Sequence, residues 1–149
     1  MKNKKILIPI IIFVIVLLIT GIGYISHVNK KNHYIETQKS RIDLYFKYNL
    51  KKYTSMKITK VEKNPMGDYF IDGYVNGKKD YDFKAFLSIE DNNQYNGMIN
   101  YNPKTLGKLF KEEEPKNKWK PDEIIKKEHL DKTKYEANPP SLVVHINLL

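Results

Sequence analysis

The 149-residue chain contains no cysteine. This absence excludes a disulfide framework, a thiol nucleophile and a lipoprotein anchored through an acylated cysteine. Arginine is almost as scarce, because Arg41 is the only arginine among 26 basic residues. Phosphate and base recognition favours the planar fork of arginine. The formal net charge of +9 therefore indicates a solvated, lysine-rich surface, and we predict no nucleic-acid partner.

The sequence also lacks the patterns that carry catalysis or bind metals. It has no G-x-S-x-G motif, no phosphate-binding loop and no His-Glu-x-x-His. No histidine has another histidine or a cysteine at metal-ligand spacing; the four are His27, His33, His129 and His145. We therefore predict a protein that is not an enzyme and that holds no metal or cofactor.

Charge is missing altogether from residues 6–25 (ILIPIIIFVIVLLITGIGYI). This run matches the roughly 20 residues that a helix needs to cross a bilayer. Lysines precede it, so the positive-inside tendency places residues 1–5 in the cytoplasm. The alternative is a cleaved signal peptide, whose apolar region is typically shorter. We predict a single-pass protein of the cell membrane that contacts membrane lipid through residues 6–25. A juxtamembrane linker (26–33) and an extracytoplasmic C-terminal domain follow.

Residues 34–102 are predicted to form an α+β core. Apolar side chains recur at helical spacing over residues 34–53, among them Ile35, Ile42 and Phe46, while Arg41 is expected on the solvent side. From Met56 the period changes to two, with turns at residues 64–67, 76–77 and 91–93. The pattern predicts one long helix packed on a four-stranded antiparallel meander, as in a cystatin-like or NTF2-like roll.

The alternation of side chains restricts the register of this sheet. A two-residue Asn76-Gly77 loop would set odd positions opposite even ones and split the apolar rows. A three- or five-residue loop keeps the rows together, and the three-residue register places Phe70 opposite Phe86. A two-residue loop at 65–66 pairs Ile58 with Gly73. A three-residue loop at 91–93 pairs Ala85 with Ile99 and starts the fourth strand at Tyr95.

Residues 103–149 are predicted to form a C-terminal extension. Asn102 and Pro103 suit the start of a short helix that carries Leu106, Leu109 and Phe110. A second short helix is expected over residues 121–132. The last segment, residues 142–149, is expected to be an edge strand or a loosely held tail.

Large apolar side chains fall on the sheet face that points away from the helix, and such groups need a cover or a partner. One reading is that Trp119 and the 121–132 helix fold over them. The other is that they bind another protein. The candidate protein-binding residues are Phe70, Tyr74, Phe86 and Trp119.

The run that begins at Arg41 (RIDLYFKYNLKKYTSMKITKVEKNPMGDYFIDGYVNGKKDYDFKAFLS) resembles a staphylococcal family of small exported or membrane-anchored proteins, the domain-of-unknown-function family 1433. The resemblance covers residues 36–140, including the KYEANPP segment. It implies export and a small α+β domain, and it supplies no catalytic residues.

These observations favour a membrane-tethered, extracytoplasmic protein-binding domain. A sharper hypothesis, an immunity or inhibitor protein, rests on fold-level analogy with cystatin-like modules. The alternative is a small ligand-binding or enzymatic NTF2-like domain. That alternative requires a pocket between helix and sheet, lined by Tyr45, Tyr53, Tyr81 and Tyr101.

Overall fold

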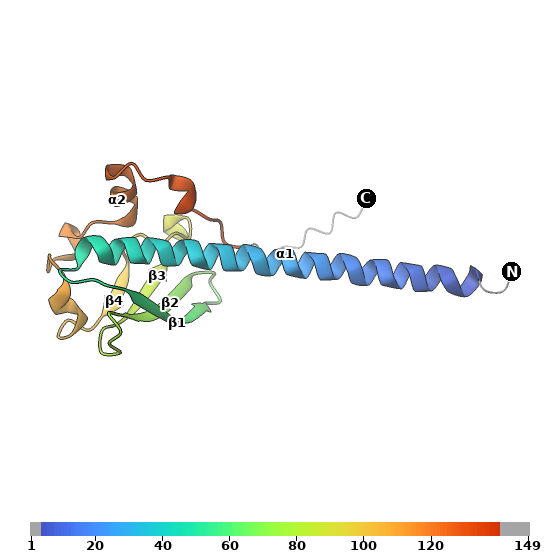
Figure 1. The fold of residues 1–149 in the computed structure, drawn as a ribbon, viewed down its shortest axis with the longest axis horizontal. Coiled ribbons are helices and arrows are strands. Elements are labelled where there is room, and N and C mark those ends of the chain that lie inside the picture. The colour runs from blue at the N-terminus through green and yellow to red at the C-terminus, as the bar shows by residue number, and fades with distance from the viewer. Residues whose placement is uncertain (1–3, 141–149) are drawn as a thin grey trace. The chain divides into compact units, whose positions relative to one another are not determined.

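The computed structural model describes residues 4–140. Its regular elements are the helices α1 (Lys4–Asn49) and α2 (Pro121–Lys127) and the strands β1 (Met56–Lys63), β2 (Tyr69–Val75), β3 (Asp82–Leu87) and β4 (Ile99–Tyr101) (Figure 1). Short 3-10 helices lie at Ile89–Asp91, Leu106–Leu109, Pro115–Asn117 and Lys132–Lys134. One compact unit spans Tyr34–Asn138, and the first part of α1 belongs to a second unit.

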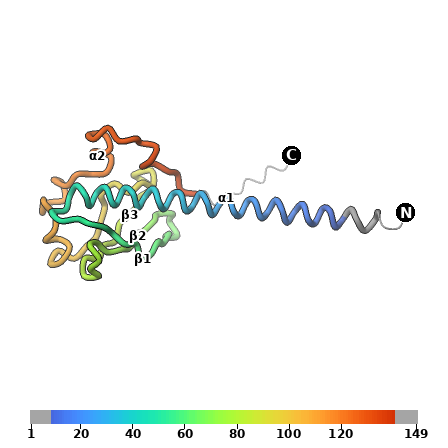
Figure 2. The backbone as a smooth tube through the Cα atoms, viewed as in Figure 1, coloured from blue at the N-terminus to red at the C-terminus, as the bar shows by residue number. Residues whose placement is uncertain are grey.

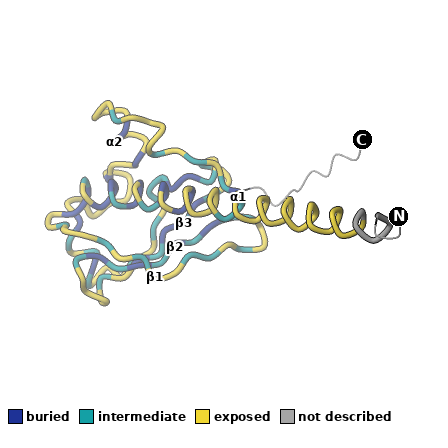
Figure 3. The backbone as a smooth tube through the Cα atoms, turned by 45° about the vertical axis from the view of Figure 1, so that its right-hand side comes forward, coloured by how far each residue is buried: buried dark blue, intermediate teal, exposed yellow. Residues whose placement is uncertain are grey.

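The first part of α1 is apolar and exposed. Every side chain from Pro9 to Ser26 is exposed, as the yellow stretch of α1 in Figure 3 shows. By length and composition this helix can cross a membrane. The hydroxyl of Thr20 is satisfied within the helix, because it donates to the carbonyl oxygens of Val16 and Leu17. The apolar helix predicted from the sequence is therefore present.

Both predicted boundaries of the following helix are wrong. Residues 26–33 form no break, since they are part of the continuous α1 and contain neither proline nor glycine. At the other end α1 stops at Asn49 and not at Tyr53. The backbone there pairs with a distant segment: Lys51 N donates to Leu109 O, and Lys111 N donates to Asn49 O, both at 2.8 Å. This tertiary pairing takes the backbone groups that another helical turn would use.

The sheet has the predicted order β1-β2-β3-β4, with every neighbouring pair antiparallel. Between β2 and β3 the register sets Phe70 opposite Phe86 and Gly73 opposite Phe83. Val75 N donates to Tyr81 O at 3.1 Å, so the connecting loop spans residues 76–80. Asn76 and Gly77 both have positive φ, as in the tight turn that their sequence suggests. The additional residues keep the two apolar rows on one face, which confirms the predicted parity.

A β-bulge decides the register between β1 and β2. Ile58 lies opposite Gly73, as predicted, but the register shifts between Ile58 and Lys60. Nearer the turn, Asn64 N donates to Asp68 O at 2.9 Å, so the loop has three residues and the predicted two-residue loop is wrong. The extra residue of the bulge at Thr59 compensates for the longer turn.

The connection between β3 and β4 also differs from the prediction. Ala85 lies opposite Ile99, as predicted. The three-residue hairpin is wrong, however, because Ile89–Asp91 form a 3-10 helix and β4 begins only at Ile99. Tyr95 instead turns towards α1, where its backbone N donates to Gln38 Oε1 at 2.8 Å.

The apolar face of the sheet packs against α1 within the Tyr34–Asn138 unit. Its buried centre joins Ile42, Tyr45 and Phe46 of α1 to Ile71, Phe83 and Leu87 of the sheet. In Figure 2 this part of α1 runs along the strands of the same unit. The α+β architecture, a long helix covering a four-stranded meander, is therefore as predicted.

The C-terminal segment packs on a different face of α1. Leu44 of α1 contacts Ile124 and Ile125 of α2 in a second, smaller apolar cluster. The segment predicted to be a helix over 121–132 is helical only to Lys127, and the short helix near Leu106 is of the 3-10 type. The predicted edge strand at 142–149 lies outside the described residues.

Candidate functional site

Two surfaces of the Tyr34–Asn138 unit are candidates for function. The first is the outer sheet face, defined as the side of β2 and β3 that points away from α1. It carries six side chains: Phe70, Asp72, Tyr74, Asp82, Lys84 and Phe86. Phe70 and Phe86 meet edge to face, with ring centroids 5.3 Å apart and an interplanar angle of 88°. Both rings are partly exposed.

Charged groups surround this aromatic pair. Lys84 Nζ lies 3.4 Å from Asp72 Oδ1 and 5.7 Å from the centroid of the Phe70 ring. An open concavity of about 680 Å³ adjoins them, with Asp72, Tyr74, Lys84 and Asn100 in its wall. An aromatic centre with charged neighbours is a common composition for a protein-binding surface.

The C-terminal segment does not cover the outer sheet face. Because α2 packs on α1, it lies across α1 from the sheet (Figure 1). The expectation that Trp119 and the 121–132 helix fold over Phe70 and Phe86 is therefore wrong for the described residues.

The four candidate residues do not form one patch. Phe70, Phe86 and Tyr74 share the outer sheet face, whereas Trp119 lies beside the end of α1. The backbone of Trp119 exchanges hydrogen bonds with the side chain of Asn49, at 2.8 and 2.9 Å. Lys127 Nζ sits 4.3 Å from the centroid of the Trp119 ring, which is 42% exposed.

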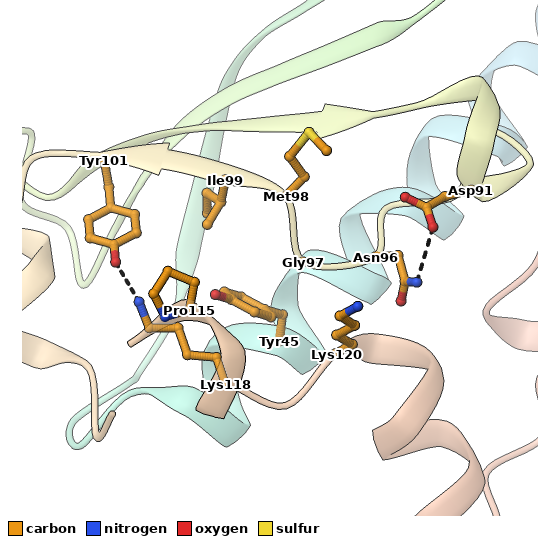
Figure 4. Close-up of a pocket in the computed structure, with 10 residues that line it drawn as sticks. All are labelled: Tyr45, Asp91, Asn96, Gly97, Met98, Ile99, Tyr101, Pro115, Lys118 and Lys120. Atoms are coloured by element: carbon orange, nitrogen blue, oxygen red, sulfur yellow. Dashed lines mark hydrogen bonds between the residues drawn. The ribbon is translucent and has the colours of Figure 1, made fainter. Parts of the chain in front are cut away.

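The second surface is the Lys118 cleft, a hollow of about 390 Å³ beside β4 (Figure 4). Residues from three separate stretches of the chain line it: Tyr45, Asp91, Asn96, Gly97, Met98, Ile99, Tyr101, Pro115, Lys118 and Lys120. The chain enters β4 through Gly97, whose φ of +97° favours glycine. Sequence spacing gives no indication of this cleft, because its residues lie between positions 45 and 120.

Lys118 and two tyrosines form the polar end of the cleft. Lys118 is 7% exposed, and its ammonium group donates to the hydroxyl oxygen of Tyr101. Its Nζ also lies 4.0 Å from the centroid of the Phe110 ring. Burial raises the pKa of the Tyr45 hydroxyl well above its usual range, and the nearby Tyr101 adds to the shift. Tyr45 is therefore a neutral hydroxyl at physiological pH.

The tyrosine-lined pocket predicted between helix and sheet has a different lining. Only Tyr45 and Tyr101 of the four predicted residues reach the Lys118 cleft. Tyr53 stacks on Phe46 with ring centroids 5.9 Å apart, and its hydroxyl donates to Asp43. Phe46 in turn packs edge to face on Phe83, so aromatic rings fill the space between helix and sheet at this point.

Polar residues of α1 that the helical pattern did not single out hold the C-terminal segment. Arg41, expected on the solvent side, is fully buried. Its Nε donates to Tyr95 O at 2.7 Å, and its two terminal nitrogens donate to Tyr135 O and to Asp122 Oδ1. One turn earlier, Gln38 donates to Gln94 Oε1 at 2.7 Å, and Gln94 donates to Ala137 O at 2.8 Å.

Within residues 4–140, no group of three histidine or acidic side chains is arranged to hold a metal ion. The model of the family described as Protein of unknown function (DUF1433) matches residues 34–127, well over half of the chain. No curated protein and no solved structure matches the sequence.

Proposed function

The chain belongs to the DUF1433 family, and we propose that it is a membrane-anchored, non-enzymatic protein whose Tyr34–Asn138 domain binds another protein outside the cytoplasm. The outer sheet face is the proposed binding surface. The observation that carries this proposal is the Phe70–Phe86 pair, whose rings are partly exposed on the outer sheet face and are not covered by α2.

Physical arguments support a protein as the partner. Aromatic side chains contribute much of the binding energy in protein interfaces when a rim of polar groups excludes water from them. On the outer sheet face Phe70 and Phe86 are the aromatic residues. Asp72 and Lys84, on the same two strands, are the polar groups beside them. An immunity or inhibitor protein is the sharper form of this proposal, and it rests on fold-level analogy alone.

The membrane anchor would hold such a domain close to a partner at the membrane. A domain held at the membrane meets its partner at a high local concentration, so a surface of modest affinity suffices. The supporting observation is the exposed apolar part of α1, which has the length and composition of a membrane span.

Site-specific photocrosslinking in the producing cells tests the proposal. A photoreactive phenylalanine replaces Tyr74 on the outer sheet face of the full-length protein, and in a control it replaces the exposed Lys126 on α2. We expect one crosslinked protein from position 74 and none from position 126.

A second substitution checks that the aromatic pair is responsible. Phe86→Ser in the position-74 reporter is expected to reduce the crosslink by at least about tenfold, as for a residue that contributes about 1.4 kcal/mol or more to binding. Equal crosslinking from both positions, no crosslink from position 74, or an unchanged yield with Phe86→Ser would refute the proposal.

A further inference from the structure

The Lys118 cleft contains a buried positive charge without a carboxylate partner among the residues that the structure describes. Lys118 is 7% exposed, yet none of the ion pairs of the described residues includes it. By contrast, the buried Arg41 pairs with Asp122. Burying a charge is costly unless it is paired and hydrogen-bonded.

The groups around Lys118 compensate for only part of this cost. The ammonium group has three donors, and within residues 4–140 the hydroxyl of Tyr101 is its one hydrogen-bond acceptor. The rings of Phe110 and Tyr101 lie 4.0 and 5.0 Å from Nζ, in the range of cation–π attraction. Two N–H groups thus remain for an acceptor at the mouth of the cleft.

The rest of the lining suits an organic ligand. Met98, Ile99 and Pro115 present apolar surface beside the ring of Tyr45, and the volume of about 390 Å³ fits a molecule of amino-acid size. Figure 4 shows Asp91 at the opposite end of the cleft from Lys118, where the Asn96 amide donates to it at 3.2 Å. Lys120 also lines the cleft on the Asp91 side, so the charges at that end are mixed, and Lys118 is the buried charge that a ligand meets.

We infer that the Lys118 cleft binds a small organic carboxylate. The carboxylate accepts hydrogen bonds from Lys118 and lies beside the Tyr101 and Tyr45 hydroxyls, and the apolar part of the ligand packs on Met98, Ile99 and Pro115. One ammonium balances one carboxylate charge. A phosphate dianion is less suited, because the cleft contains neither an arginine fork nor more than one buried cation.

This site is independent of the outer sheet face. The competing explanation of the cleft is a water-filled groove that binds no ligand. In that case Lys118 only packs against Phe110 and Tyr101. The two explanations differ in whether a carboxylate is recognised as a charge, so the probes are a matched acid and amide.

The test uses the full-length protein in detergent micelles, with N-acetylphenylalanine as the acid and N-acetylphenylalanine amide as its neutral match. Titrations are followed by the backbone amide NMR resonances of Gly97, Met98 and Ile99. We expect saturable shifts with a Kd on the order of 1 mM for the acid. The amide is expected to bind at least about tenfold more weakly, since it lacks the charge-assisted hydrogen bond.

Variants then assign the recognition to Lys118. Lys118→Met keeps a long side chain over Phe110 and is expected to weaken binding of the acid at least about tenfold. Lys116→Met, which changes an exposed lysine two residues away, is expected to leave binding unchanged. Tyr101→Phe removes the hydroxyl and keeps the ring, and we expect a smaller loss.

The acid–amide comparison needs no variant, so it stands even where Lys118→Met does not fold. Equal affinity for acid and amide would overturn the proposal, as would no saturable shift up to about 20 mM acid, roughly twenty times the expected Kd. Equal binding by the folded Lys118→Met and Lys116→Met variants would overturn it as well.

Discussion

Individual polar side chains on α1 determine how the C-terminal segment is held. Arg41, Gln38 and Asn49 each bind backbone groups of segments that lie more than 50 residues further along the chain. Such contacts satisfy buried carbonyl and amide groups that would otherwise lose their hydrogen bonds on burial. Arg41, Gln38 and Asn49 are therefore structural residues of α1, whereas Glu36 and Lys47 remain on its solvated surface.

Arg41 is the residue of this set whose removal we expect to cost most. Arg41→Met leaves the carbonyl oxygens of Tyr95 and Tyr135 without their donor in a buried site. Breaking such a network is expected to lower the free energy of unfolding by about 3 kcal/mol. Urea unfolding of the full-length protein in detergent, followed by the fluorescence of Trp119, measures this change; the chain has one tryptophan.

Lys39→Met is the matched control for Arg41→Met. Lys39 is also basic and also on α1, but its side chain is 31% exposed and pairs with the exposed Glu36. An exposed pair of this kind contributes about 0.5 kcal/mol. A loss of less than about 1 kcal/mol for Arg41→Met would contradict the structural role of its three hydrogen bonds.

The helical pattern did not predict the burial of Arg41, for a physical reason. Periodicity reports which face of a helix is apolar, and Arg41 lies outside the apolar row that packs on the sheet. Its partners are the backbone carbonyls of Tyr95 and Tyr135 and the carboxylate of Asp122, whose locations depend on how the whole domain folds. A second packed face built from backbone acceptors leaves no apolar pattern in the sequence.

At the scale of elements, the alternation of apolar and polar side chains along the strands was the most informative pattern in the sequence. The apolar rows had to share one face, so the pairs Phe70–Phe86, Ile58–Gly73 and Ala85–Ile99 were predicted correctly. The loops were predicted less well. A bulge at Thr59 absorbs one residue of the first turn, and the 3-10 helix at Ile89–Asp91 replaces the third turn. The alternation of side chains determines which residues of paired strands share a face, but it does not determine the number of residues in the connecting loop.

The close approach of β1, β2 and β3 at Gly73 makes this strand position intolerant of a side chain. A Cβ on Gly73 would lie 2.5 Å from Lys57 O and 2.8 Å from Phe83 Cζ. Gly73→Ala is therefore expected to lower the free energy of unfolding by about 3 kcal/mol through overpacking. The measurement is the same urea unfolding of the full-length protein.

Gly77→Ala, in the adjacent loop, separates crowding from backbone strain. A Cβ at Gly77 meets nothing within 4 Å, but its φ of +69° is unfavourable for alanine. We expect a loss of about 1 kcal/mol, the cost of the left-handed conformation. A Gly73→Ala variant as stable as Gly77→Ala would show that β1 and β3 do not pack around Gly73 as described.

At the scale of the whole molecule, the sequence pattern predicted the apolar helix and the α+β fold class but not the position of the cleft. The uncharged run at residues 6–25 predicted an apolar helix, and the change from period 3.6 to period 2 predicted an α+β domain after it. The Lys118 cleft could not be predicted, because three stretches that are distant in sequence form it: Tyr45 of α1, residues 91–101 and residues 115–120. Concave sites depend on tertiary packing, which no local pattern records.

The absence of cysteine makes the proposed membrane arrangement directly measurable. Single cysteines introduced as Lys2→Cys and Lys104→Cys are the only thiols in their variants, and Lys104 is exposed in the Tyr34–Asn138 domain. If residues 1–5 lie in the cytoplasm, a membrane-impermeant maleimide labels Lys104→Cys in intact cells. Lys2→Cys then reacts only after the membrane is permeabilised.

The same two variants distinguish an anchor from a cleaved signal peptide. An anchored chain keeps both thiols in the membrane fraction, because about 20 apolar residues hold it in the bilayer. A chain cleaved after the apolar segment releases the Lys104→Cys domain into the medium and separates it from position 2. Labelling of Lys2→Cys in intact cells while Lys104→Cys stays protected would reverse the orientation, and the outer sheet face would then meet cytoplasmic partners.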